Sequence, residues 1–83
     1  MTTITIQCSD EVLISLKETA ESFRRQLALA AAMKFYELGR LSSGRAADLA
    51  GLSRVEFLHR AAEFGVPAWD LAEEQLREDQ KHA

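Results

Sequence analysis

Residues 42–53 read S-S-G-R-A-A-D-L-A-G-L-S, an order that is typical of two helices joined by a tight turn. The paired alanines are small enough for two helices to cross closely, and Gly51 supplies the positive φ angle that a tight turn needs. Ser42 or Ser43 can cap the first helix and Ser53 the second, where Glu56, three residues later, completes a capping box. The segment therefore predicts a helix-turn-helix whose second helix ends at Gly65.

In a DNA-binding helix-turn-helix, the second helix enters the major groove with its N-terminal end first. Arg54 lies at that end, and a guanidinium can bond to O6 and N7 of one guanine, so Arg54 is the predicted base-reading residue. Serines and arginines near the two helix N-termini are placed to bond phosphates. The predicted DNA-binding residues are Arg40, Ser42, Arg45, Ser53, Arg54 and His59.

The charge distribution leaves open a second interpretation of the helix-turn-helix corner, residues 39–66. The chain carries 10 Lys and Arg against 13 Asp and Glu, a net charge of −3, so it lacks the strongly basic balance of many nucleic-acid binders. Residues 39–66 have a net charge of +1, from four arginines against three carboxylates. Glu56 and Glu63 lie on the polar arc of the second helix, where they repel phosphate. The corner is therefore also compatible with a packing or protein-binding role without DNA.

The first 38 residues predict a short strand followed by two helices. Residues 2–7 alternate isoleucine with threonine and glutamine, which favours an extended strand. No second strand candidate follows, so the expected partner is the same strand of a second subunit. Helices are predicted over residues 10–22 and 23–38, and the run 27–33 is apolar on every side. A chain of this length buries only about 60% of its unfolded surface, so residues 1–38 are predicted to form the interface of a homodimer or higher oligomer.

The tail at residues 67–83 has a net charge of −3 and contains a tryptophan. Asp70 can cap a last helix, and short acidic helices with a few large anchors commonly fold on a basic or grooved partner. The tail is therefore predicted to bind a partner protein, with the alternative that Trp69 packs on its own domain. The predicted partner-binding residues are Trp69, Leu71, Glu73, Glu74, Leu76 and Glu78.

Residue types that support catalysis or metal binding are sparse. The sequence has a single cysteine, Cys8, and its two histidines, His59 and His82, lie far apart, so neither an intrachain disulfide nor a metal site is expected. No nucleophile–base pair or carboxylate pair can be assembled, so we expect neither an enzyme nor a cofactor. The run 27–33 is the longest apolar one, far short of the roughly 20 residues of a membrane span. Without an export signal, a cytoplasmic location is expected.

These patterns predict a mainly α protein. It has a short N-terminal β-strand, then a helical domain containing a helix-turn-helix, and a C-terminal acidic tail helix. The predicted regions are residues 1–38 for dimerisation, 39–66 for the helix-turn-helix and 67–83 for binding a partner.

The residues A-x-K-F-Y-E-L-G-R-L-S-S-G-R-A-A-D-L-A-G-L-S-R-V-E-F-L, followed by G-V-P, resemble uncharacterised protein family 0175. The resemblance covers about residues 27–80, together with an N-terminal strand of the right kind. It implies a helix-turn-helix fold and the antitoxin half of a toxin–antitoxin pair, because these small prokaryotic proteins are regarded as antitoxin-like and are often encoded beside PIN-domain toxins. The chain departs from the family at Arg60 and Ala61, where the family is more aliphatic. The matching residues are Tyr36, Gly39, Ser42, Ala46, Ala47, Gly51, Phe57 and Gly65, with Arg54 at a commonly polar position.

The predicted function is that of an antitoxin-like DNA-binding regulator that dimerises and neutralises a toxin partner, a PIN-type nuclease. Two alternatives remain open. Residues 2–38 also resemble one half of a ribbon-helix-helix dimer, in which Thr3, Thr5 and Gln7 of the strand would read DNA. The other alternative is a protein-interaction module that binds no DNA.

Overall fold

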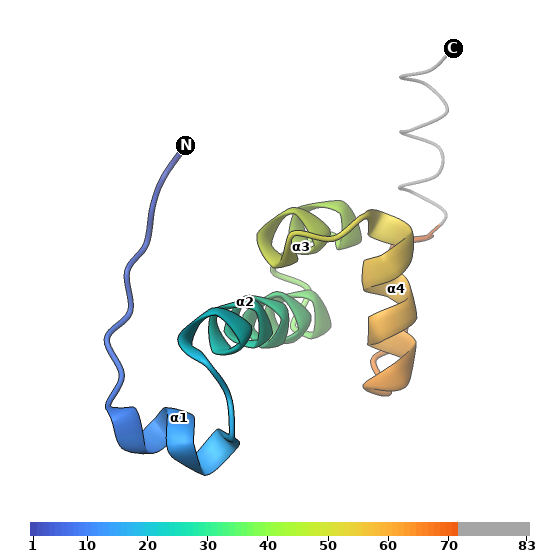
Figure 1. Cartoon of the computed structure of the whole chain (residues 1–83). Coiled ribbons are helices and arrows are strands. Elements are labelled where there is room, and N and C mark those ends of the chain that lie inside the picture. The colour runs from blue at the N-terminus through green and yellow to red at the C-terminus, as the bar shows by residue number, and fades with distance from the viewer. Residues whose placement is uncertain (72–83) are drawn as a thin grey trace.

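Four helices follow one another along the chain in the computed structural model, which describes residues 1–71 (Figure 1). They are α1 (Asp10–Leu16), α2 (Ala20–Glu37), α3 (Ser43–Ala50) and α4 (Arg54–Glu63). The mainly α character predicted from the sequence is confirmed. Most of the predicted tail helix, residues 72–83, lies outside the described residues.

The predicted β-strand at residues 2–7 is wrong. Residues 1–9 form neither strand nor helix, and the described part of the chain contains no sheet (Figure 1). Ile4 and Ile6 are 79% and 63% exposed. A strand needs a second strand to pair its backbone N–H and C=O groups, and residues 1–71 supply none. The ribbon-helix-helix alternative loses the element on which it relied.

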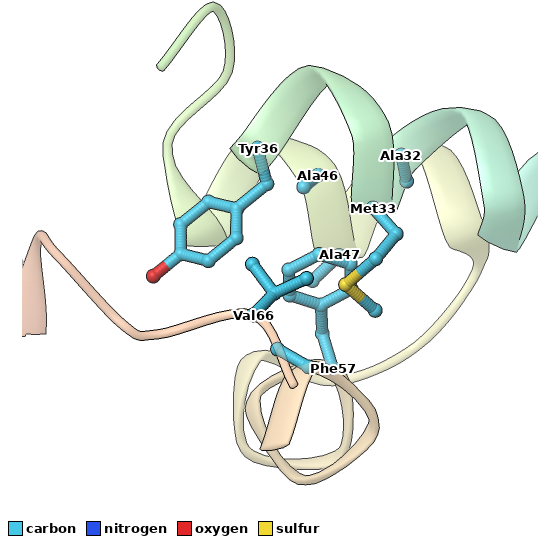
Figure 2. Close-up of a cluster of buried hydrophobic side chains, with 8 residues drawn as sticks. Ala32, Met33, Tyr36, Ala46, Ala47, Phe57 and Val66 are labelled. Atoms are coloured by element: carbon cyan, nitrogen blue, oxygen red, sulfur yellow. The ribbon is translucent and has the colours of Figure 1, made fainter. Parts of the chain in front are cut away.

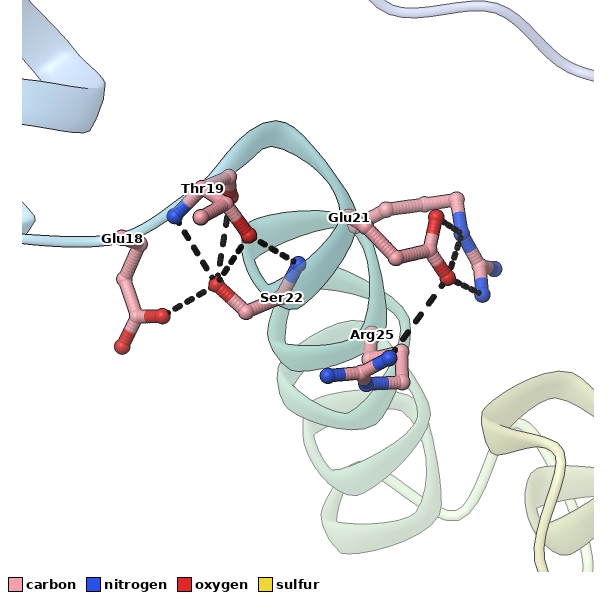
Figure 3. A network of polar contacts seen from close by, with 6 residues as sticks. Glu18, Thr19, Glu21, Ser22 and Arg25 are labelled. Atoms are coloured by element: carbon pink, nitrogen blue, oxygen red, sulfur yellow. Dashed lines mark hydrogen bonds and ion pairs between the residues drawn. The ribbon is translucent and has the colours of Figure 1, made fainter.

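Both predicted N-terminal helices are present, but the break between them lies earlier than residue 22. α1 ends at Leu16 because Lys17 adopts a left-handed conformation with φ at 57°. Thr19 and Ser22 then form a capping box that starts α2 (Figure 3). The backbone N–H of Ser22 donates to Thr19 Oγ1 at 3.1 Å, and that of Thr19 donates to Ser22 Oγ at 3.0 Å. This local cap accounts for a helix start that apolar periodicity alone placed too late.

Charged side chains surround the same helix start. The Ser22 hydroxyl donates to the Glu18 carboxylate, and this bond, with a second from Gln26, lowers the pKa of Glu18. Glu21 pairs with Arg24 at 2.8 Å and with Arg25 at 3.7 Å, all three side chains being solvent-exposed (Figure 3). These contacts support the first turns of α2 and contribute little to the core.

The core lies where the C-terminal half of α2 meets α3 and α4 (Figure 2). Tyr36 and Phe57 are fully buried, and their rings meet edge to face with centroids 5.4 Å apart. Small side chains from three helices surround this pair, which lets the helices approach closely. The buried apolar residues are Ala32, Met33, Tyr36, Ala46, Ala47, Phe57, Ala61 and Val66.

The N-terminal end of the molecule has no comparable core. α1 contains no buried residue, and Ile14 on it is 73% exposed. Of the run 27–33, predicted to be buried on every side, Ala32 and Met33 are buried while Ala30 is exposed. Among the described residues, no helix combines the length and apolar character that crossing a membrane requires.

Candidate nucleic-acid interface at the helix-turn-helix corner

The predicted helix-turn-helix is present as α3, a three-residue turn and α4. Gly51 adopts φ 73°, and the N–H of Leu52 donates to the Ala47 carbonyl at 3.0 Å, which closes the turn. Ser53 caps α4 by accepting from the Glu56 N–H at 3.1 Å, as predicted. Its hydroxyl also donates to the Glu56 carboxylate at 3.2 Å. The predicted capping box is not completed, because the Glu56 carboxylate bonds to the Ser53 hydroxyl and not to its backbone N–H. Local bonds therefore fix the geometry of the turn.

A buried carboxylate at the N-terminus of α3 ties the corner to the chain after α4. Asp70 is 4% exposed, and its Oδ2 accepts from the Ser43 backbone N–H at 2.7 Å. Its other oxygen accepts from the Tyr36 hydroxyl at 3.0 Å. Burying a charge is costly unless strong hydrogen bonds compensate for the lost water. Two donors from two different helices, α2 and α3, thus hold one carboxylate.

Trp69 is attached to the same place through Tyr36. The indole stacks on the Tyr36 ring, with centroids 5.6 Å apart and planes 23° apart, and its Nε1–H donates to the Tyr36 carbonyl at 2.9 Å. The backbone N–H of Trp69 donates to the Tyr36 hydroxyl at 3.2 Å. Burial, with the hydrogen bond to Asp70 adding to it, raises the pKa of Tyr36. Tyr36 therefore serves as an uncharged donor and acceptor in this network.

Arg54 points into this network at the start of α4. Its Nε donates to the Ser43 hydroxyl at 2.9 Å, and the side chain is partly buried. Its Nη2 atom is enclosed and has no hydrogen-bond partner among the described residues. The base contact expected of Arg54 stays a prediction, and making it would require breaking the bond to Ser43.

The other predicted DNA-binding residues lie nearer the surface. Ser42 caps α3 by accepting from the Arg45 N–H at 3.2 Å, while the Arg45 side chain is exposed. Arg40 is exposed and its guanidinium lies 5.5 Å from the centre of the Phe35 ring. Ser53 and His59 are exposed on α4. The structure thus places one exposed guanidinium, that of Arg45, in the first turn of α3, where it can reach a phosphate. The Ser43 and Arg45 N–H groups of the same turn are already bonded to Asp70 and Ser42.

The outward side of α4 carries apolar and acidic side chains beside the basic His59 and Arg60. Val55 is 66% exposed, and Glu56 and Glu63 are exposed as well. Arg60 lies 3.7 Å from Glu63, which offsets part of its charge. The expectation of two phosphate-repelling carboxylates on this helix agrees with their exposed placement.

Two of the predicted partner-binding residues lie in the described chain. Trp69 is 51% exposed and Leu71 is 42% exposed. The remaining ones, Glu73, Glu74, Leu76 and Glu78, lie outside the described residues. Trp69 packs on its own domain and still shows half its surface to solvent, so the two alternatives for this side chain are compatible.

Sequence reasoning missed the network around Asp70, which it assigned only to capping a tail helix. Tyr36 was noted only for its place in the family pattern, and Ser43 only as an alternative cap. The available signal for the network was the pair Trp69 and Asp70, which follows the helix-ending Gly65 and Pro67 by a few residues. It did not reveal the partners, which lie 27 and 34 residues earlier.

Comparisons with known proteins agree with the resemblance. The model of the uncharacterised protein family UPF0175 matches residues 1–83. A UPF0175 protein of Aeropyrum pernix is 36% identical over 69 residues, which cover 83% of this chain and 76% of that protein. No solved structure matches the chain.

Proposed function

The chain belongs to the uncharacterised protein family UPF0175, and we propose that it is an antitoxin-like DNA-binding regulator that neutralises a toxin protein. The observation that carries the proposal is the capped helix-turn-helix of α3 and α4, with Arg45 exposed beside the start of α3. An exposed guanidinium beside a helix start is a usual phosphate donor in such corners.

DNA contact is tested by replacing Arg45 with alanine in the full chain. Binding to all sequences is expected to weaken, with the slope of log K against log salt falling by about one unit because one phosphate contact is lost. Arg24→Ala is the matched control, since Arg24 is an exposed arginine on α2 away from the corner. A wild-type protein that binds its own promoter region no better than random DNA at moderate salt contradicts the proposal.

Arg54 sharpens the same test. If this side chain leaves Ser43 to read a base, Arg54→Ala relaxes the preference at one base pair and costs roughly 1–3 kcal/mol. If it only positions α4, the affinity falls equally for every DNA sequence and the free energy of unfolding falls as well. The base-specific outcome alone supports direct reading.

The proposed toxin contact is the tail, and the toxin class that the family resemblance implies is a PIN-type nuclease. An exposed tryptophan is the kind of side chain that carries most of an interface's energy, so Trp69→Ala is expected to cost about 2 kcal/mol or more in toxin affinity. Because Asp70 belongs to the corner, the informative truncation removes only residues 72–83. A chain truncated there that still inhibits its toxin with full affinity would exclude residues 72–83 from the contact, and a Trp69→Ala variant of full affinity would place the contact on the helices instead.

The proposal includes a homodimer built through the N-terminal region. α1 buries none of its residues, and Ile14 and Leu16 on it are exposed, as are Ile4 and Ile6 before it. A second copy of the chain is expected to cover these side chains. Light scattering of wild type and Ile14→Asp tests this, since a folded wild-type monomer at low micromolar concentration excludes it.

A protein-interaction module without DNA binding is the second candidate. It is favoured by a groove of ≈ 590 Å³ between α2, the turn and α4, which is lined by Leu29, Leu52 and Phe64 among others. The exposed Val55 and Glu56 on α4 favour it too. Phe64→Asp distinguishes the candidates, because it disrupts the groove and should abolish partner binding only if the groove is the contact.

A further inference from the structure

Trp69 and Asp70 are neighbours in the chain with opposite surroundings. Trp69 is 51% exposed and stands where the C-terminal tail begins, so a partner can reach it. Asp70 is 4% exposed and bonds to the start of α3. One residue therefore faces outward, and the next is anchored inside the helix-turn-helix corner.

We propose that Trp69 and Asp70 form a latch that transmits the capture of the C-terminal tail to the helix-turn-helix corner. Their Cα atoms are separated by one peptide unit, about 3.8 Å, so a displacement of the backbone at Trp69 also shifts Asp70. Both are also held by the same hydroxyl, because Tyr36 Oη donates to Asp70 and accepts from the Trp69 N–H. A partner that pulls the backbone of Trp69 away from the Tyr36 hydroxyl therefore also draws Asp70 away from Ser43.

The corner depends on that carboxylate at two points. When Asp70 leaves, the Ser43 N–H loses its acceptor in a fully buried position. Ser43 also holds Arg54 through its hydroxyl, and the Nη2 atom of Arg54 has no partner among the described residues to compensate. The starts of α3 and α4 therefore loosen together.

This coupling extends the proposed function, and its consequence for DNA and toxin affinity rests on that function. The starts of α3 and α4 are the proposed DNA-facing parts of the corner, and Trp69 is the proposed toxin anchor. Binding at either place then changes the affinity at the other by the same factor, as linkage requires. The latch itself is a property of the free chain.

Amide hydrogen exchange on the free, full-length Trp69→Ala chain tests the latch from the tail side. We expect the Ser43 amide to exchange about tenfold faster or more, because it loses a hydrogen bond to a charged group. Phe64→Ala is the matched control, since Phe64 is an aromatic residue that is 59% exposed and the hydrogen bonds of Asp70 go to Tyr36 and Ser43. The Phe23 amide, bonded to the Thr19 carbonyl at the far end of α2, should keep its rate and so separates local opening from unfolding.

The latch is overturned if Ser43 exchange in Trp69→Ala stays within twofold of wild type, or if Phe64→Ala accelerates it equally.

Should Trp69→Ala unfold the chain, Asp70→Asn tests transmission in reverse, with the single tryptophan as reporter. Its emission should shift to longer wavelength and be quenched more by iodide, while Asp48→Asn on exposed α3 surface leaves it unchanged. If the emission and quenching of Trp69 in Asp70→Asn stay as in wild type while the Ser43 amide exchanges faster, Asp70 moves without Trp69 and the latch is overturned. Neither readout uses DNA or toxin, so failure of the proposed function leaves the result interpretable.

Discussion

The N-terminal end and the helix-turn-helix corner of this chain are both rich in apolar residues, but only the corner buries them in a core. Residues 1–16 contain six large aliphatic side chains, Ile4, Ile6, Val12, Leu13, Ile14 and Leu16, and bury none of them fully. The corner buries Tyr36 and Phe57 completely among alanines from α2, α3 and α4. Small residues and capped turns let helices approach, whereas large residues without a facing surface remain in solvent.

The largest expected effect comes from removing the aromatic centre of the corner. Phe57→Ala should lower the free energy of unfolding by about 3–5 kcal/mol, because it leaves a cavity against Tyr36. Ile14→Ala on α1 should change it by less than about 0.5 kcal/mol in dilute monomer, since that side chain is 73% exposed. Urea unfolding of both variants measures the contrast. Equal losses would mean that α1 is packed as tightly as the corner.

Removing one hydroxyl tests the polar part of the corner. Tyr36→Phe leaves Asp70 with one donor fewer and the Trp69 N–H without an acceptor, so a loss of about 1–3 kcal/mol is expected. Ser15→Ala removes an exposed hydroxyl from α1 and should have no measurable effect. Thermal unfolding compares the two, and an unchanged midpoint in Tyr36→Phe would show that the network does not stabilise the fold.

Gly51 in the corner and Lys17 in the N-terminal region are both left-handed and should respond in opposite directions. Gly51→Ala should cost about 1–2 kcal/mol from backbone conformation alone, because φ is 73° and no atom lies within 4 Å of the added Cβ. Lys17→Gly relieves the same conformation at the end of α1 and should slow exchange of the α1 amides only. A global rise in stability in Lys17→Gly would show that α1 unfolds together with the corner.

The smallest effect is a pH dependence confined to alkaline solution. The raised pKa of Tyr36 means that the folded chain prefers the neutral phenol. The contribution of the Tyr36 phenol to the free energy of unfolding is therefore fully present below the unfolded pKa of about 10. That contribution is lost as pH rises through the folded pKa. Urea unfolding between pH 8 and 11 should show this decline, and Tyr36→Phe should flatten it. An identical slope in both proteins would assign the decline to other groups.

Local sequence signals predicted the corner well. Gly51 and Ser53 occupy the turn and cap positions assigned to them, and Ser42 is the one of the two candidate serines that caps α3, since these roles depend on residues within a few positions. The strand at residues 2–7 was predicted from alternation alone, which cannot show whether a second strand exists. The break at Lys17 was missed because apolar periodicity continues across it.

The sequence by itself determined the family, the mainly α character and the position of the helix-turn-helix, because these follow from short-range patterns. Only the tertiary structure decided what Arg54 and Asp70 do. Their partners, Ser43 and Tyr36, are 11 to 34 residues away, and no local pattern encodes such a pairing. Packing of α2 against α3 and α4 encloses these groups together, and enclosed charged groups must find hydrogen-bond partners in whatever lies beside them.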